Sequence, residues 1–249
     1  MIYQRANRER LYGNISAEKA DQLSAIDRDY GEVSKAVREK TKGILLPEDR
    51  AQLAAIEAER RADLAQVLTP QELLEYDFRS SPSAATVRQS LRNFEATEEE
   101  FRALTTLQLA FDKTYGSPAS LSAEQQQQRA LATTELTAQI KALLPPDRYA
   151  EYEIKTDPAY SSVVMLLAQY SSPADATVVV GAQRDLAQRF TALRNNRSLD
   201  AATRNAQLDA LSAEANTRMA AALGPEAFKS YKMNGGPINA LLNRPASKP

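Results

Sequence analysis

Three tyrosines at matched positions are the most regular residues in this chain that could take part in chemistry. Tyr76, Tyr152 and Tyr231 each stand six residues after one proline and six residues before another. They could form a repeated ligand contact, together with Arg79 and Lys155 three residues further on. Alternatively, each ring packs at a helix end and its hydroxyl bonds a turn carbonyl. The fixed distance to two prolines favours this structural interpretation.

Paired carboxylates are the second kind of candidate. Glu72 with Glu75, and Glu151 with Glu153, offer the two carboxyl groups that a glycoside hydrolase uses. Nothing in the sequence marks a cleft around them, and solvated acids on helix faces are the ordinary explanation. The acidic run at residues 98–100 is better explained by the helix dipole and a capping box than by a metal site, because no calcium-loop spacing accompanies it.

The residues that are missing narrow the possible chemistry further. The chain has no Cys, which excludes thiolate catalysis and Cys-ligated zinc or iron–sulfur clusters, and no His, the commonest general base. It also lacks Gly-rich phosphate loops and the nucleophile elbow of serine hydrolases. Lys+Arg total 31 against 32 Asp+Glu, so a strongly basic nucleic-acid binder is excluded. We expect a protein that is not an enzyme, needs no cofactor or metal and does not bind nucleic acid.

Composition and periodicity predict an all-α protein. Only 8 of the 249 residues are Gly, and good helix formers dominate the rest. No window alternates as a strand does over more than a few residues. The longest apolar run, residues 163–168, is too short to span a bilayer. Because this run is apolar all round, we expect it to form a helix buried centrally between units.

A threefold repeat organises the sequence. The pattern Leu-x-Pro-x5-Tyr-x5-Pro occurs three times, its tyrosines 76 and 79 residues apart. We expect an N-terminal segment at 1–15, repeats at 16–94, 95–171 and 172–243, and a disordered tail at 244–249. The repeats could stack as a helical array or share the core of one bundle. No signal-peptide pattern opens the chain, whose start fits a natural beginning or a cut after a removed signal or anchor.

Start signals and apolar spacing place the helices within each repeat. Thr69 and Glu72 flank Pro70 as a full capping box, and Thr97 and Ser122 begin similar boxes without the proline. Apolar residues mostly at spacings of three and four, or their sums, form one stripe on each long helix, as at Leu131, Leu136, Ile140 and Leu143. The expected helices span 16–42, 48–67, 70–78, 82–93, 97–115, 122–143, 146–155, 158–170, 173–195, 199–222 and 225–233, with a stub at 237–243.

A run of three valines is the candidate for binding a partner. Val178, Val179 and Val180 would cover about 200° of a helix, so they cannot all face one core. We expect a helix that leaves one valine for a subunit or partner contact. A short strand, or simple extra burial, are the alternatives.

The segment Leu68-Thr69-Pro70-Gln71-Glu72 resembles the LTxxQ motif of the Spy/CpxP-type periplasmic proteins, which are small all-helical stress chaperones and sensors. The fifth residue departs from the motif, since it is Glu72 rather than Gln, and the two later copies lack both Thr and Gln. The resemblance implies a bacterial extracytoplasmic binding module or chaperone, acting on a protein or an unfolded polypeptide. It carries over no catalytic residue and leaves the oligomeric state open.

Two other functions stay open beside this one. One is a carboxylate-dependent hydrolase of the cell envelope, which would need a cleft with two close carboxyl groups, one of raised pKa. The other is a purely structural, oligomer-forming envelope protein. An exposed apolar groove would favour the binding module over both.

Overall fold

The computed structural model describes residues 11–116, 121–234 and 236–245, and every regular element over these residues is a helix. This confirms the all-α prediction. No helix of the described part has the length and apolar character needed to cross a membrane. Most of the predicted N-terminal segment (1–10 of 1–15) and of the predicted tail (246–249 of 244–249) lies outside the described residues.

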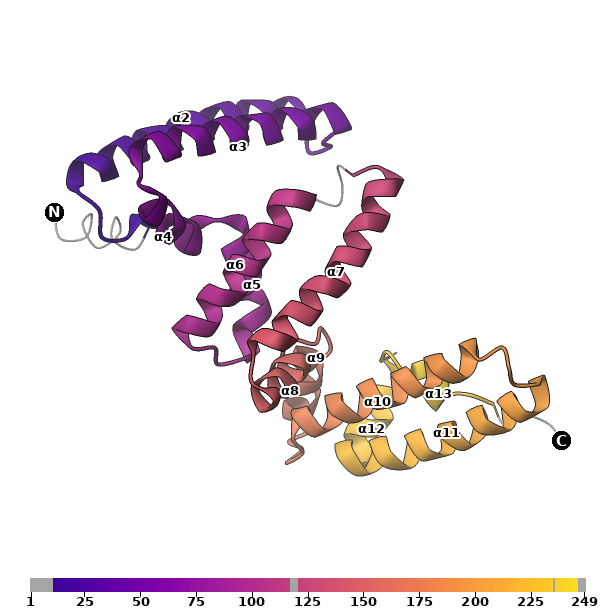
Figure 1. Ribbon diagram of the computed structural model, residues 1–249. Helices are drawn as coiled ribbons and strands as arrows, with labels where there is room; N and C mark the ends of the chain where they lie inside the picture. Colours follow the sequence, from indigo (N-terminus) through magenta and orange to yellow (C-terminus); the bar gives the residue numbers. More distant parts are fainter. Residues whose placement is uncertain (1–10, 117–120, 235, 246–249) are drawn as a thin grey trace. The chain divides into compact units, whose positions relative to one another are not determined.

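The chain divides into two compact units, comprising Met1–Ser90 with Ala96–Pro145, and Leu91–Glu95 with Pro146–Pro249. The first contains α2 (Ala17–Lys40), α3 (Pro47–Val67), α4 (Pro70–Ser80), α5 (Pro82–Ser90), α6 (Glu98–Tyr115) and α7 (Ala123–Leu143) (Figure 1). The second contains the 3-10 turn η1 (Leu91–Asn93), α8 (Pro146–Lys155), α9 (Tyr160–Gln169), α10 (Ala176–Asn195), α11 (Ala201–Leu223), α12 (Pro225–Met233) and α13 (Asn239–Leu242). The segment predicted as the second repeat, 95–171, therefore contributes to both units.

α4, α6 and α7 begin at the capping boxes that the sequence predicts, whereas α9, α10 and α13 begin two to three residues after their predicted starts. The Thr69 hydroxyl accepts a hydrogen bond from the Glu72 N–H, while the Glu72 carboxylate accepts one from the Thr69 N–H. Thr97 and Ser122 cap α6 and α7 in the same reciprocal way. Each box satisfies two backbone donors that have no partner in the first turn, which is why local sequence suffices to fix these starts.

Each unit has its own hydrophobic core. In the first, Leu23 of α2 and Leu64 of α3 are fully buried together with residues of α4, which packs against the end of this helix pair. In the second, α10 and α11 form the pair, and Leu241 and Leu242 of α13, with Ile238 just before it, add to its core. The α10–α11 core is the larger cluster and supports the pocket described below.

Two helices bury less than their apolar sequences led us to expect. α9 buries Val163 and Leu167 against α10 and α12, but leaves Val164 and Met165 exposed. The expectation that this apolar run is buried on all sides is therefore wrong, because neighbours cover only one side of it. α7 buries none of its residues, and Leu131 in its stripe is 70% exposed. α7 packs chiefly on α6, whereas α3 and α11 are each also covered by a short helix.

Candidate functional site

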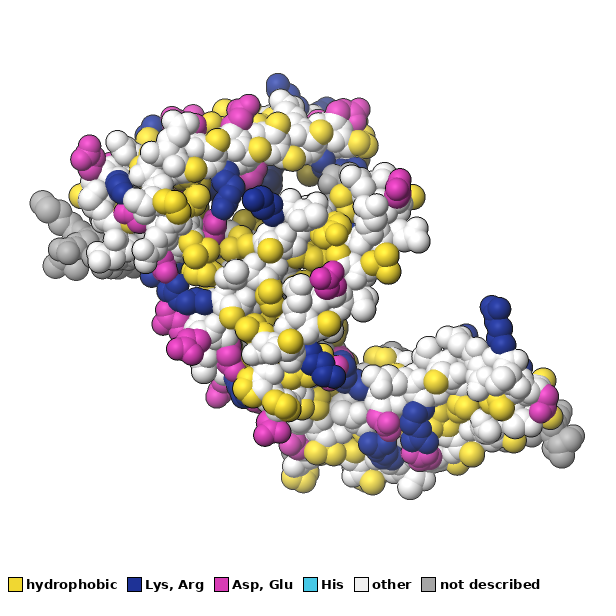
Figure 2. All heavy atoms as spheres, in the orientation of Figure 1, with side chains coloured by type: hydrophobic (Ala, Val, Ile, Leu, Met, Phe, Trp, Pro, Cys, Tyr) yellow, Lys and Arg dark blue, Asp and Glu magenta, His cyan; other side chains and the backbone are white. Residues whose placement is uncertain are grey.

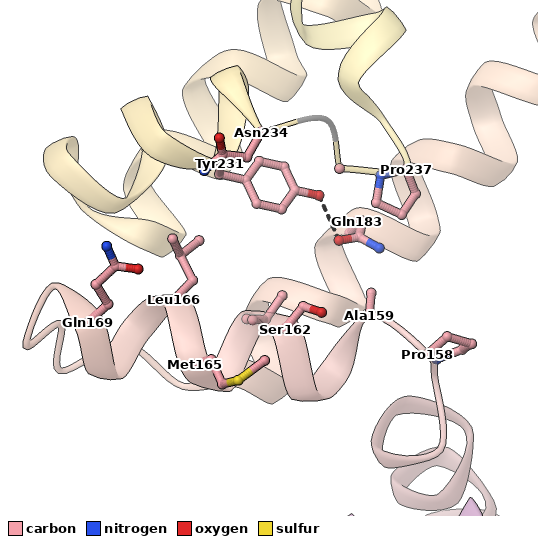
Figure 3. A pocket seen from close by; sticks show the side chains of 12 residues that line it. Pro158, Ala159, Ser162, Met165, Leu166, Gln169, Gln183, Tyr231, Asn234 and Pro237 are labelled. Atoms are coloured by element: carbon pink, nitrogen blue, oxygen red, sulfur yellow. Dashed lines mark hydrogen bonds between the residues drawn. The ribbon is translucent and has the colours of Figure 1, made fainter.

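A pocket of about 490 Å³ lies within the second unit, between α9 and the end of α12 (Figure 3). None of its lining residues, all of them in the described part of the chain, carries a charge. Its walls are proline and aliphatic carbon, interrupted by amide and hydroxyl groups of Ser162, Gln169, Gln183 and Asn234. A mostly apolar cavity with a few fixed polar groups is the usual form of a small binding site.

Tyr231 forms the inner polar corner of the pocket. Its hydroxyl donates a 2.6 Å hydrogen bond to the Oε1 of Gln183, and both side chains are buried (Figure 3). Burial raises the pKa of Tyr231 to about 12, and the negative charge of Asp157 adds to this rise. The phenol therefore remains protonated at neutral pH, so it acts as a hydrogen-bond donor and cannot act as a base.

The loop after α12 closes the wall beside this tyrosine. A Cβ at Gly236 would lie 2.5 Å from the Cζ and hydroxyl oxygen of Tyr231, closer than any side chain tolerates. Glycine is therefore needed for the backbone to approach the ring, and Pro237 continues the wall. The sequence predicts a stub helix at 237–243, but α13 begins only at Asn239, so Gly236 and Pro237 form pocket wall rather than a helix start.

The rim of the pocket is hydrophobic and adaptable. Met165 on α9 lines the pocket while 66% of its surface is exposed, and Leu166 beside it is half-buried. An unbranched thioether can follow the shape of different apolar partners. The arrangement can hold an uncharged, largely apolar group and offer it hydrogen bonds, but it supplies no acid or base for a reaction.

The three repeated tyrosines occupy three different surroundings. Tyr76 is buried in the first unit, where its hydroxyl bonds the guanidinium of Arg60 and the carboxylate of Asp27, and its ring stacks on Tyr12. Tyr152 is half-buried and meets the ring of Phe94 edge to face. These contacts do not form a repeated ligand site. The expectation of a turn carbonyl as partner is wrong for the hydroxyls of Tyr76 and Tyr231, which bond side chains of neighbouring helices.

The two basic residues that follow these tyrosines are also placed apart. Lys155 forms an ion pair with Glu151, 2.7 Å away, one turn back on α8. Arg79 extends over the backbone of Gly13 in the first unit, and its own carbonyl accepts a hydrogen bond from Arg88. Neither cation faces the pocket.

In the first unit, both candidate carboxylates form ion pairs with basic side chains. Glu72 accepts a 2.6 Å contact from Lys19 in addition to its capping bond, and these interactions lower its pKa to about 2. Arg102 contacts both carboxylate oxygens of Glu75 and lowers its pKa as well. A glycosidase acid needs the opposite shift, towards a raised pKa.

The pair in the second unit is held in the same way. Glu151 lies between Arg148 and Lys155, and the contact with Lys155 is the main cause of its lowered pKa. Arg184 bonds Glu153 at 2.8 Å. These carboxylates are therefore tied into ion pairs along the helices rather than aimed into a shared cleft.

The acidic run at the start of α6 forms capping bonds and ion pairs within that helix. Glu100 accepts the Thr97 N–H at 2.8 Å, and Glu98 pairs with Arg102 one turn later. Over the described residues, no three His, Cys, Asp or Glu side chains gather so as to hold a metal ion.

The three valines of residues 178–180 differ in burial, because successive residues of a helix point in different directions. Val179 and Val180 are fully buried in the core of the second unit, whereas Val178 is 60% exposed. The proposed binding role of Val179 and Val180 is therefore corrected, because both are packed in the core of the second unit and leave no surface for a partner. Val178 is the one left outside the core, and its contact with a partner stays a prediction.

Comparison with protein-family models, with curated proteins and with solved structures gives no match for this chain. The tyrosine repeat in the sequence singles out Tyr231, but no motif indicates Gln183 and Met165 as parts of one pocket. No sequence signal links these two residues, because they come from different helices.

Proposed function

We propose that this protein is a non-enzymatic binding module that holds an apolar stretch of another polypeptide, with one apolar side chain of that partner entering the pocket beside α9. The observation that carries the proposal is the uncharged, mainly apolar lining together with the exposed Met165 at its rim. Amide and hydroxyl groups in the wall suit the peptide groups that accompany such a side chain.

The ion pairs described above support binding over hydrolysis. A carboxylate-dependent enzyme would need one carboxyl group that stays protonated near neutral pH. The pKa values of Glu72, Glu75 and Glu151 are shifted downward instead. We therefore prefer a binding role to an envelope hydrolase.

The setting that we propose is bacterial and extracytoplasmic, with a chaperone-like activity. The resemblance of residues 68–72 to the LTxxQ motif supports this assignment. Because no charge lines the pocket, binding should depend little on salt, and it should need neither ATP nor a cofactor.

Light scattering of a chemically reduced client protein tests the proposal. Equimolar protein without ATP should slow aggregation, at low and at high salt alike. Met165→Lys places a charge on the apolar rim and should weaken the interaction about tenfold. The matched control is Met233→Lys. Met233 is similarly exposed, at 70%, and does not line the pocket.

Three results would contradict the proposal. Absence of suppression at several-fold excess would exclude chaperone-like binding. Equal losses in the two lysine variants would exclude the pocket as the contact. Hydrolysis of a cell-envelope glycan, abolished by Glu75→Gln or Glu151→Gln, would establish the enzyme instead.

A further inference from the structure

The loop that joins α2 to α3, residues 41–46, presents hydrophobic side chains to solvent; we call it the hairpin tip. Ile44 is 73% exposed and Leu46 is 52% exposed. Hydrophobic side chains are visible at this end of the α2–α3 pair in Figure 2. The tip lies in the first unit and shares no residue with the pocket beside α9.

Leu46 departs from the polar capping found at the same place in the other long helix pairs. It is the N-cap residue of α3 and makes no side-chain capping bond. At the same place in the other long helix pairs, Ser122 caps α7 and Asp200 caps α11 through their side chains. A polar cap is strongly preferred at this position. An exposed leucine at the N-cap makes the helix less stable than a polar cap would, and its side chain adds only apolar surface.

A second local rule is broken two residues before Ile44. Lys42 has a φ of 49°, a left-handed conformation that is unfavourable for a residue with a Cβ, and Gly43 follows with a φ of 90°. The Ile44 N–H donates to the Thr41 carbonyl across this turn, at 3.0 Å. The strained turn thus holds a lysine beside the exposed isoleucine. Departures from local preference concentrate at functional sites.

Cations adjoin the apolar side chains. Arg38, Lys40 and Lys42 are exposed on the α2 side of the tip. Of the acids nearby, Glu39 pairs with Lys35 at 3.7 Å, and Asp49 accepts the Leu46 N–H at 2.9 Å. Glu48 is exposed at the start of α3 and limits the net positive charge.

We propose that the hairpin tip inserts into the surface of an anionic phospholipid bilayer. Ile44 and Leu46 would enter the boundary between headgroups and acyl chains, while Lys40 and Lys42 meet the lipid phosphates. Apolar groups next to cations are the chemistry of interfacial membrane binding. Because acids offset part of the charge, insertion supplies most of the affinity and anionic lipid strengthens it. The chain would thereby bind a membrane through residues that do not line the pocket.

Sedimentation of the full chain with vesicles tests this proposal. The vesicles contain phosphatidylcholine alone or an equal mixture with phosphatidylglycerol. Wild type should bind the anionic vesicles several-fold more tightly than the neutral ones. The double variant Ile44→Ser/Leu46→Ser should lose about tenfold in affinity or more. Serine at position 46 also restores a cap, so this variant should fold at least as stably as wild type.

Three further variants separate insertion from other effects. Leu131→Ser, at the equally exposed leucine of α7, should bind vesicles within about twofold of wild type. Lys40→Gln/Lys42→Gln should reduce the preference for anionic vesicles while retaining binding to neutral ones. Met165→Lys should bind vesicles as wild type does, so the result does not depend on the pocket.

The proposal is overturned if wild type fails to sediment with anionic vesicles. It is also overturned if the Ile44→Ser/Leu46→Ser and Leu131→Ser variants bind alike. Self-association that the tip variant abolishes, without vesicle binding by wild type, would assign the tip to a protein contact and equally overturn it.

Discussion

At the scale of single residues, the hydrogen bond between Tyr231 and Gln183 connects stability with the candidate site. It joins α12 to α10 and fixes the inner wall of the pocket. Both groups are buried, so neither can replace its partner by bulk water. The bond therefore matters more than a typical surface hydrogen bond.

We predict that Tyr231→Phe lowers the free energy of unfolding by about 1–3 kcal/mol, because the Gln183 Oε1 is left without its donor. Urea denaturation followed by circular dichroism measures the change. Tyr170→Phe is the control, since Tyr170 is exposed and should tolerate the loss of its hydroxyl. Equal midpoints for wild type and Tyr231→Phe would contradict a stabilising role for this bond.

The same tyrosine should give an alkaline pH dependence. Its pKa is raised from 10.0 to about 12, so the native state retains a proton that the unfolded state loses. The contribution of Tyr231 to the free energy of unfolding is complete below pH 10. It falls between pH 10 and 12, at up to about 1.4 kcal/mol per pH unit. Tyr231→Phe should show a shallower fall than wild type over this window. Parallel curves would show that Tyr231 ionises normally in the folded protein.

At the scale of elements, the start of α4 shows how local sequence fixes a helix. Thr69 and Glu72 cap each other's backbone, and Lys19 of α2 holds the Glu72 carboxylate as well. The cap thus also ties α4 to its neighbour. At the start of α3, Asp49 accepts the Leu46 N–H, but the Leu46 side chain makes no capping bond in return.

We predict that Thr69→Ala lowers the free energy of unfolding by about 1 kcal/mol, while Thr69→Ser changes it little. The alanine removes the acceptor for the Glu72 N–H, and the serine keeps it. Midpoints of urea denaturation distinguish the two variants. A midpoint for Thr69→Ala that matches wild type would show that water satisfies the first turn equally well.

At the scale of the whole molecule, two compact units with separate cores organise the chain. Leu64 is buried in the first core and Met219 in the second. Core truncations to alanine at such sites typically cost 2–5 kcal/mol. Their effects should remain within the unit that carries them if each unit is a cooperative folding element.

Hydrogen exchange of Leu64→Ala and Met219→Ala tests this independence. Each variant should lose amide protection mainly in its own unit, because its cavity weakens only that core. The variants serve as controls for each other, since both remove a large buried side chain. Uniform loss of protection over the described residues in either variant would show that the units unfold as one.

The sequence by itself determined the class of the fold and the positions of its helices. Capping residues such as Thr97 and Ser122 and the prolines at helix starts act over one turn, so they can be read without tertiary information. The predicted helices accordingly correspond one to one with those observed from α2 to α12, except that α9 and α10 begin two and three residues after the predicted prolines, and the predicted stub at 237–243 is the shorter α13. The threefold repeat remains a feature of the sequence.

Only the tertiary structure decided which apolar faces are buried. The stripe on α7 and the apolar run of α9 look like core in the sequence, yet Leu131 and Met165 are exposed because no neighbour covers them. The pocket likewise depends on residues from three helices whose approach no local pattern encodes. Periodicity shows that a helix has an apolar face, whereas burial depends on what packs against that face.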